Sequence, residues 1–296
     1  PLSAIFTTKI NSFEQGYVVF NKLISFISDN PQLFLAITSL FIFSLIGYIY
    51  YRFSVNVYLS IIIFVCFGLY MFSFTGLRQA IAFSITFFSF KFIVERKIKH
   101  FLVSVFLAFS IHSSAIIYFF VWPLWNIRHT NKLAISLFGI TFLLLPFYGA
   151  IFSFVVPLLF REKYLTYMNG GSAINLIILY LFIYLLPLFI KTNDFSVKND
   201  IYKNNLELQI ENFIRWMAYC SFLFQSLGLI GGDSITRIAF YFSVFLPLYI
   251  PIIFKRAKFK SLIYTCITIL FIAFFYHDTS KEFYNIVPYI FFWELI

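Results

Sequence analysis

Apolar runs of about 20 residues recur along the whole chain, and this feature limits what it can fold into. A helix of that length crosses the hydrocarbon core of a bilayer and satisfies its backbone hydrogen bonds internally. The composition agrees, because 61% of the residues are hydrophobic and only 11% are charged, whereas a soluble domain carries about 25% charged residues. We predict an all-α, polytopic membrane helical bundle of about nine to ten spans.

The basic residues between the apolar runs predict how the spans are oriented. The net charge of +10 arises mainly from short loops that we expect on the cytoplasmic side, and we expect no nucleic-acid partner. These loops contain Arg52; Arg96, Lys97 and Lys99; Arg128 and Lys132; and Lys255, Arg256, Lys258 and Lys260. The polar segment 191–212 is predicted to join them as a cytoplasmic loop. Spans are expected at about 33–51, 57–74, 78–94, 133–159, 173–190, 213–230, 238–254 and 261–276.

Residues 1–296 are predicted to form a single integral membrane domain. Because the chain begins at Pro1 and the topology turns its N-terminal segment outward, we expect that a first N-terminal span is missing. Residues 12–29 are too polar to span and are predicted to form an outward amphipathic helix at the membrane interface. Packing of this helix against other helices is the alternative. Its apolar face contains Phe13, Tyr17, Phe20, Ile24 and Ile27, with a capping box at Ser12 and Gln15 and an end at Asn30-Pro31.

The segment 101–125 has basic loops at both ends, which a single span cannot satisfy. We predict two shorter helices that meet near His112, either as a re-entrant hairpin or as a thin, tilted pair. Broken backbone at membrane depth persists only where it is buried in protein or lines a wet cavity. The break at His112 therefore predicts a functional site.

Three arginines are expected at the outer boundary, where the usual charge bias disfavours them. A single arginine there can snorkel to the headgroups, but Arg78, Arg161 and Arg237 together, with Lys163, favour binding of an anion. A guanidinium fork fits phosphate oxygens, so a lipid-linked phosphate is the simplest ligand.

His112 is predicted to lie at membrane depth, where a neutral imidazole can accept a proton. The alternative is an interhelical hydrogen bond without a chemical role. His100 and His129 are expected to be solvated, and His277 beside Asp278 is a weaker candidate. Among the outward carboxylates, Glu14, Glu162 and Asp233 are each expected to pair with an arginine or to contact a sugar hydroxyl. Gly170-Gly171 and Gly231-Gly232 are predicted outer turns.

The three cysteines lie within apolar runs and lack the spacing of metal ligands. We expect them to be small core residues, and we expect neither a metal nor another cofactor. They are Cys66, Cys220 and Cys266.

Four stretches carry a resemblance to a known family: "FEQGYVVFNKLISFI", "GLRQAIAFSI", "FSIHSSAIIYF" and "TRIAFYFSVFLPLYIP". Their order and spacing resemble the EpsG family of bacterial exopolysaccharide proteins, which belongs with the Wzy-type polysaccharide polymerases. The resemblance implies a GT-C-like architecture and a glycosyltransferase at the outer face of the bacterial inner membrane. Such an enzyme makes exopolysaccharide, capsule or O-antigen by moving a glycan from undecaprenyl diphosphate to a lipid-linked repeat unit.

The resemblance also implies roles for particular residues. Arg78, Arg161 and Arg237 would hold the diphosphate without a metal, and His112 would orient or deprotonate the acceptor hydroxyl. Further contacts to the substrate are expected from Gln79, Lys163, Glu14, Asp233 and Tyr241. The implied partners are an undecaprenyl-diphosphate-linked oligosaccharide, the lipid bilayer, and a chain-length regulator and a flippase of the same pathway. A glycan ligase, a membrane acyltransferase and a lipid-linked oligosaccharide flippase are the alternative functions.

Overall fold

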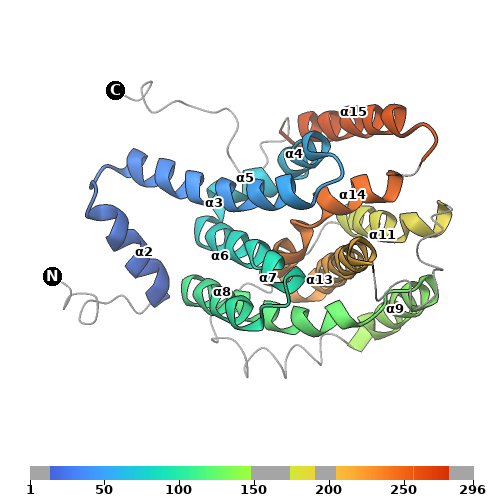
Figure 1. The fold of residues 1–296 in the computed structure, drawn as a ribbon, viewed down its shortest axis with the longest axis horizontal. Helices are drawn as coiled ribbons and strands as arrows, with labels where there is room; N and C mark the ends of the chain where they lie inside the picture. The colour runs from blue at the N-terminus through green and yellow to red at the C-terminus, as the bar shows by residue number, and fades with distance from the viewer. Residues whose placement is uncertain (1–13, 148–173, 191–204, 256, 280–296) are drawn as a thin grey trace. The chain divides into compact units, whose positions relative to one another are not determined.

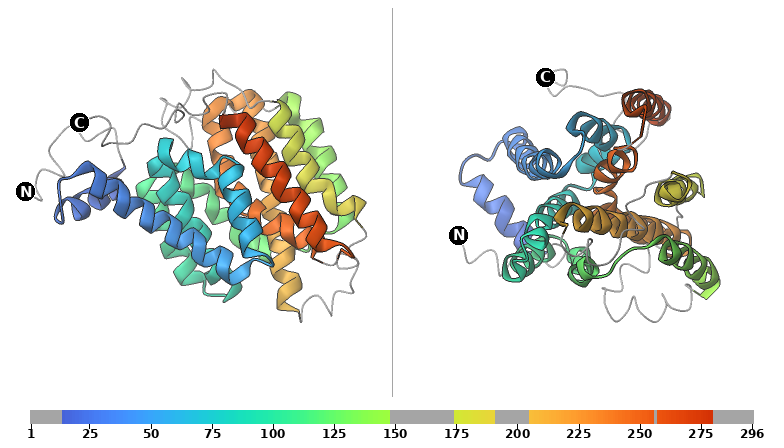
Figure 2. Two further views of the ribbon diagram at one scale, coloured as in Figure 1. Left: turned by 90° about the horizontal axis from the view of Figure 1, so that it is seen from above. Right: turned by 45° about the vertical axis from the view of Figure 1, so that its right-hand side comes forward.

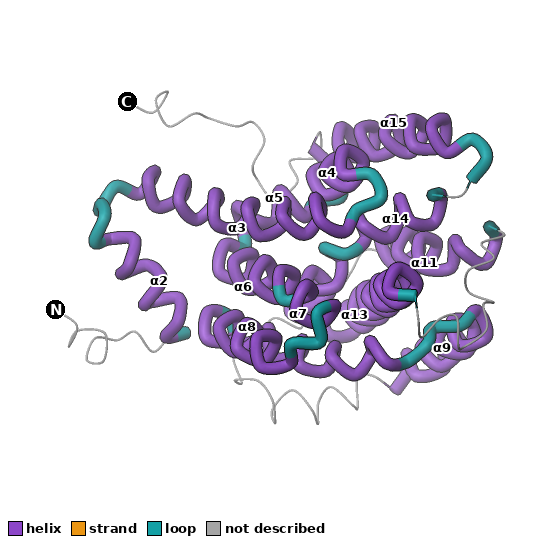
Figure 3. Tube along the Cα trace, in the orientation of Figure 1, coloured by secondary structure: helices purple, strands orange, loops and turns teal. Residues whose placement is uncertain are grey.

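The computed structural model describes residues 14–147, 174–190, 205–255 and 257–279 (Figure 1). Within these residues every regular element is a helix (Figure 3). The chain divides into two compact units, which we call unit 1 (Pro1–Ile116 and Ala257–Ile296) and unit 2 (Ile117–Arg256). Whether they form one integral membrane domain, as predicted from the sequence, stays a prediction.

Unit 1 contains seven consecutive helices and the last helix of the described chain. In unit 1, α3 packs against α6 and α6 against α8 (Figure 1), and α15 packs against α4 (Figure 2). The bounds are α2 Gln15–Ser25, α3 Pro31–Phe53, α4 Val57–Cys66, α5 Leu69–Thr75, α6 Leu77–Phe88, α7 Phe90–Val94, α8 Ile98–Ile111 and α15 Lys260–Thr279.

Unit 2 contains the remaining described helices, among which α11 packs against α13 and α13 against α14. The 3-10 helix η1 begins within unit 1 and continues into unit 2. The bounds are η1 Ser113–Asn126, α9 Asn131–Leu144, η2 Leu145–Phe147, α11 Ile174–Phe189, α13 Leu206–Ser243 and α14 Leu246–Phe254.

The prediction of an all-α polytopic membrane bundle is confirmed. Three described helices are long and apolar enough to cross a membrane, and the number rises to five if each of two bent helix pairs counts as one span. Three further apolar helices are shorter. The other predicted spans, up to about nine to ten in total, stay predictions. The three long spans are Pro31–Phe53, Leu77–Val94 and Lys260–His277, and the shorter helices are Ile98–Ile111, Asn131–Phe147 and Ile174–Phe189.

The chain breaks at His112, where a break was predicted. Helix α8 ends at Ile111, His112 has extended backbone with φ −149° and ψ 118°, and η1 follows. Extended backbone interrupts the α-helical hydrogen-bond ladder, so the two helical segments around His112 are separate elements. Gly232 also breaks α13, with φ 65° and ψ −164°, at the predicted Gly231-Gly232 turn.

Two predicted spans are bent rather than straight. The span predicted at 57–74 is the pair Val57–Cys66 and Leu69–Thr75, which meet at 50°. Gly68 lies between them with φ 80°, a left-handed conformation that glycine adopts without steric cost. The span predicted at 238–254 contains a 49° bend between Ile235–Ser243 and Leu246–Phe254. Pro247 lies in the first turn of the second helix, where its missing N–H costs little.

Two polar segments also differ from prediction at their ends. Asn30-Pro31 was expected to end the N-terminal helix, but Asn30 instead caps α3 by accepting the Gln32 N–H at 2.8 Å. The predicted loop 191–212 is helical from Leu206, because the Asn205 side chain accepts the Leu208 N–H at 3.2 Å and caps α13. Residues 191–204 lie outside the described residues.

Helix α2 occupies the core of the predicted amphipathic segment and packs against α8 and α3. Ile24 is buried, and the ring of Phe20 lies 5.8 Å from that of Phe41 on α3. Part of the predicted apolar face therefore packs against other helices, which was the alternative. Leu23 and Phe26 remain exposed, and a position at the outer membrane interface stays a prediction.

Candidate functional site

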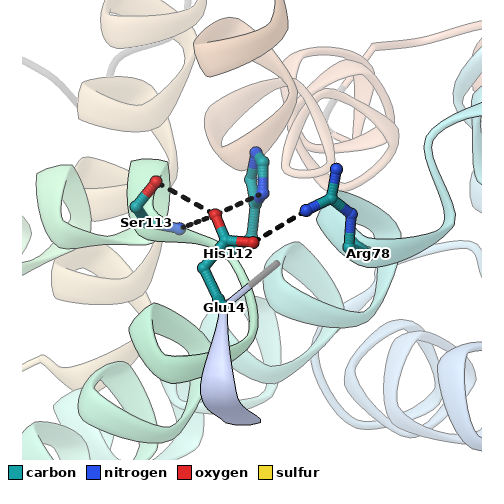
Figure 4. A network of polar contacts seen from close by, with 4 residues as sticks. All are labelled: Glu14, Arg78, His112 and Ser113. Atoms are coloured by element: carbon teal, nitrogen blue, oxygen red, sulfur yellow. Dashed lines mark hydrogen bonds and ion pairs between the residues drawn. The ribbon is translucent and has the colours of Figure 1, made fainter. Parts of the chain in front are cut away.

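The carboxylate of Glu14 lies at the centre of a polar cluster in unit 1 (Figure 4). Its Oε2 accepts a hydrogen bond from Nη1 of Arg78 at 2.8 Å. Its Oε1 accepts hydrogen bonds from Oγ of Ser113 at 3.2 Å and from the Ser113 N–H at 3.4 Å, and it lies 3.6 Å from Nδ1 of His112. Residues 64 and 99 positions from Glu14 in the sequence thus meet at one carboxylate. We call these four residues the Glu14 cluster.

Three helices begin at this cluster. Glu14 is the N-cap of α2, Arg78 lies in the first turn of α6, and Ser113 is the first residue of η1. The N-terminal end of a helix carries a partial positive charge, which stabilises an anion and disfavours a cation such as Arg78. An anion beside Arg78 is therefore needed, and Glu14 provides it. The local backbone charge favours a negative group at this position.

The Glu14 cluster is half-buried. The exposed fractions of the side chains are 20% for Glu14, 32% for Arg78 and 16% for His112. Burial raises the pKa of the Glu14 carboxyl, but backbone hydrogen bonds, including that from Ser113, the charge of Arg78 and, when His112 is protonated, the charge of His112 more than offset it. The net effect is a pKa below the ordinary value. The carboxylate is therefore ionised at neutral pH while its partners remain accessible to a ligand.

Glu14 is held in place by close packing of α2 on α8. A Cβ added to Gly16 would lie 2.2 Å from Oγ of Ser110 and 2.7 Å from the Ser110 carbonyl carbon, so only glycine allows this approach. The Glu14 side chain makes no capping hydrogen bond to its own helix. The capping box predicted at Ser12 and Gln15 does not involve Glu14, and Ser12 lies outside the described residues. The carboxylate is instead directed to α6 and to the break after α8.

The structure brings together three of the predicted site residues: Glu14, Arg78 and His112. Ser113 joins them, and its place beside His112 in the predicted break was the signal in the sequence. Gln79 follows Arg78 in α6 and is buried, with an exposed fraction of 4%.

The other predicted site residues fall elsewhere. Arg237 and Asp233 are exposed on α13 of unit 2, and Tyr241 on the same helix is fully buried. A joint role of Arg237 with Arg78 stays a prediction. Arg161 and Lys163, together with Glu162 and Gly170-Gly171, lie outside the described residues.

A second polar cluster lies in unit 2 around Arg215, a residue that the sequence did not single out. The Arg215 side chain is fully buried and donates to the carbonyl oxygen of His129 at 3.2 Å and to Oδ1 of Asn131 at 2.9 Å. Asn212 joins the same segment, because its Oδ1 accepts the His129 N–H at 2.6 Å. We call Arg215, His129, Asn131, Asn212 and Tyr184 the Arg215 cluster.

The expectation that His129 is solvated is wrong, because His129 is fully buried. Its Nε2 lies 3.2 Å from the Tyr184 hydroxyl, and its ring centroid lies 4.5 Å from that of Trp216. Burial and the charge of Arg215 lower the pKa of His129 to about 3. The basic residues next to His129 predicted an exposed loop. In the structure, residues of α11 and α13 cover this loop at His129.

Three segments predicted to be cytoplasmic meet in unit 2. Nζ of Lys255 binds Oε1 of Glu207 at 2.9 Å and also contacts Glu211. In α13, Asn212 next to Glu211 donates to the carbonyl oxygen of Ile127 at 3.0 Å, which brings in the Arg128–Lys132 segment. These contacts agree with the prediction that all three segments lie on the same side of the membrane.

Among the described residues, no group of three or more His, Cys, Asp or Glu side chains is arranged to hold a metal ion. The cysteines within the described residues are free; Cys66 is buried, Cys220 is partly buried and Cys266 is exposed. The expectation that all three are core residues is therefore wrong for Cys266, which lies on α15.

Fold and site together define a class of protein. It is an all-α polytopic membrane protein with a half-buried Arg–Glu–His cluster where three helices begin. The chain belongs to the EpsG family, whose family model matches residues 2–291. The resemblance inferred from four short stretches is thereby confirmed over nearly the whole chain. Searches of curated proteins and of solved structures each found no match. Family membership supports a function of the polysaccharide-polymerase type.

Proposed function

We propose that this protein is a membrane glycosyltransferase that lengthens a lipid-diphosphate-linked glycan at the outer face of the bacterial inner membrane. The observation that carries the proposal is the Glu14 cluster, in which an arginine fork and a histidine lie around a position built for negative charge. A diphosphate leaving group needs the arginine fork, and an acceptor hydroxyl needs the histidine.

The proposed reaction uses Arg78 and His112 on opposite sides of the bond that breaks. The acceptor hydroxyl oxygen bonds to the anomeric carbon of the growing chain, and the bond from that carbon to the diphosphate oxygen breaks. The electron pair leaves with the diphosphate, whose charge Arg78 stabilises through directed hydrogen bonds. His112 receives the hydroxyl proton. Gln79, Arg161, Lys163 and Arg237 are proposed further contacts to the diphosphate, and Asp233 and Tyr241 to the glycan.

The geometry of unit 1 supports the outer face. Helices α6 and α7 run from Arg78 to the basic turn at Arg96–Lys99, and α8 returns from that turn to His112. The Glu14 cluster and the basic turn therefore lie at opposite ends of the α6–α8 pair. Arg52 also interacts electrostatically with Glu95 beside this turn, which adds a second basic segment there. Because basic loops favour the cytoplasm, the cluster is expected outside.

The contacts of Lys91 make a transport function less favourable than transfer. A flippase needs charged groups through the depth of the bundle. The charges predicted from this sequence lie at the edges of the spans, and Lys91 is the main exception. Its Nζ lies 5.1–5.3 Å from the ring centroids of Phe88, Tyr48 and Phe92. These rings stabilise the ammonium group locally, which explains the charge without a translocation path.

Purified protein supplied with undecaprenyl-diphosphate-linked repeat units tests the proposal. We expect a ladder of lipid-linked products of increasing length, together with released undecaprenyl diphosphate. A gene deletion should correspondingly leave single repeat units. Transfer of a finished glycan to a different acceptor without a ladder would instead indicate a ligase. Transfer of an acyl group would indicate an acyltransferase.

A further inference from the structure

We propose that Glu14 is a positioning residue that binds Arg78 with one carboxylate oxygen and places the other beside His112, and so couples the two sides of the transfer. This inference rests on the proposed function and adds to it a residue for which the sequence predicted only an ion pair or a sugar contact.

The two oxygens of Glu14 have separate tasks. Oε2 binds Nη1 of Arg78 at 2.8 Å, whereas Oε1 lies 3.2 Å from Oγ of Ser113 and 3.6 Å from Nδ1 of His112. Figure 4 shows Arg78 and Ser113 approaching the carboxylate from opposite sides. It also shows the second ring nitrogen of His112 pointing away from Glu14. In the proposed reaction, that nitrogen, Nε2, receives the proton of the acceptor hydroxyl.

A carboxylate beside Nδ1 matters most when the imidazole gains a proton. As the acceptor oxygen bonds to the anomeric carbon, its proton moves to Nε2, and the imidazole becomes a cation that carries a proton on Nδ1 as well. An anion at 3.6 Å is too far for a hydrogen bond but stabilises that cation electrostatically. Glu14 itself stays ionised throughout, in agreement with its lowered pKa. The proton later leaves Nε2 for water or for the released diphosphate.

The same carboxylate fixes the other reacting partner. A guanidinium held at Nη1 has less freedom to rotate, so it meets the diphosphate in a defined orientation. Arg78 also lies with its Cζ 5.8 Å from the ring centroid of Tyr17, a second residue of α2. Helix α2 thus contributes both contacts, and the close approach of Gly16 to Ser110 sets its position on α8.

Glu14→Gln tests the inference because it keeps the size of the side chain and removes its charge. We expect the kcat for chain extension to fall by about 10²- to 10⁴-fold, the range of general acid–base catalysis. The KM for the lipid-linked donor should change little, because Glu14 does not bind the donor directly. Glu14→Asp should recover part of the kcat, since a carboxylate remains. Glu95→Gln is the matched control, because Glu95 forms an exposed ion pair with Lys97 at 2.8 Å in the same unit.

A small carboxylate should also restore a truncated variant. Formate added to Glu14→Ala should recover part of the kcat, because the space beside Arg78 and His112 can hold it, whereas chloride should not. Thermal unfolding of each variant shows whether it folds, and Glu14→Gln carries the test alone if Glu14→Ala does not fold.

Three results would overturn the inference. They are wild-type kcat in Glu14→Gln, a raised KM with unchanged kcat, and no recovery by formate in a Glu14→Ala protein that unfolds at the wild-type temperature. The outcome for wild type is separate: if it extends no chain, the proposed function fails and the inference falls with it. If wild type is active and only Glu14→Gln is unaffected, the proposed function stands without this role for Glu14.

Discussion

Each unit contains an arginine and a histidine in one polar cluster, but the two clusters differ in burial and in charge. In the Glu14 cluster a carboxylate pairs with an arginine that is 32% exposed and lies beside a histidine that is 16% exposed. In the Arg215 cluster the guanidinium and imidazole are both fully buried, and Arg215 donates hydrogen bonds to a carbonyl and an amide oxygen. An accessible ionic group can exchange partners with a ligand, whereas a fully buried one fixes the packing of its neighbours. We therefore assign chemistry to the first cluster and folding to the second.

The largest expected effect is the loss of folded protein in Arg215→Ala. The substitution leaves the buried His129 carbonyl without this donor, whereas Asn131 is exposed and can bind water instead. An unsatisfied buried acceptor costs about 1–3 kcal/mol, and the packing of the fully buried Arg215 side chain is lost as well, so the free energy of unfolding should fall by at least about 1–3 kcal/mol. Thermal unfolding in detergent and the amount of protein in the membrane measure it. A variant that folds normally but no longer makes polymer would reverse the assignment of the two clusters.

His112→Ala should show the opposite combination. Its side chain is partly exposed, so folding should be close to normal, while polymer formation should fall by about 10²- to 10⁴-fold through loss of the base. His100→Ala, at an exposed position of the same unit, is the control. If His112→Gln kept activity, orientation of the hydroxyl rather than proton transfer would be the role of His112. Near-normal polymer from His112→Ala would reduce it to a packing residue.

Much of the Glu14 cluster could be predicted from the sequence, because Arg78 and His112 each interrupt an apolar run where a charge is costly, and Glu14 is an outward carboxylate expected to pair with an arginine. Their meeting could not be predicted, since it depends on the packing of α2 against α8 through Gly16. The Arg215 cluster was missed for the opposite reason. Arg215 lies near the end of a predicted span, where an arginine usually snorkels, and only tertiary packing encloses it. The bends at Gly68 and before Pro247 could not be predicted either. Both lie within apolar runs long enough to form straight spans, so only the backbone geometry shows them.

Gly16→Ala should weaken the Glu14 cluster without altering any of its side chains. The new methyl group would overlap Ser110, including its backbone, so α2 must shift, at a cost of about 1–3 kcal/mol for overpacking. We expect a lower unfolding temperature and lower polymer formation. Gly47→Ala is the matched control, because no atom lies within 4 Å of the added Cβ, and it should be neutral or slightly stabilising. Equal behaviour of the two variants would show that the position of α2 does not matter.

The smallest expected effect is a difference in pH dependence between the clusters. Burial lowers the pKa of His129 from 6.5 to about 3, so the stability it contributes is complete above 6.5 and declines as the pH falls toward 3. The decline is at most about 1.4 kcal/mol for each pH unit. Glu14 also has a lowered pKa, so its contribution is present above the ordinary value of 4.5 and is lost below it.

Unfolding measured between about pH 7 and pH 5 separates the two contributions because, of Glu14 and His129, only His129 titrates in the unfolded chain over this range. We expect His129→Gln to reduce the slope of stability against pH there, and Glu14→Gln to retain the contribution of His129. The slope rather than the absolute stability is compared, since His129→Gln alters a buried site. An unchanged slope in His129→Gln would indicate that the imidazole is not buried in its neutral form.

The turnover of undecaprenyl-diphosphate-linked repeat units by purified Arg78→Lys protein tests the central claim most directly. Lysine keeps the charge but offers a compact point charge in place of a planar fork. Arg52→Lys is the control, because Arg52 is exposed at the end of α3 in the same unit. We predict a loss of about 10²- to 10³-fold in kcat for Arg78→Lys, as expected when a directed contact to a developing anion is lost, and near-normal turnover for Arg52→Lys. Wild-type turnover by Arg78→Lys would contradict the account, because Arg78 would then act only as a membrane anchor.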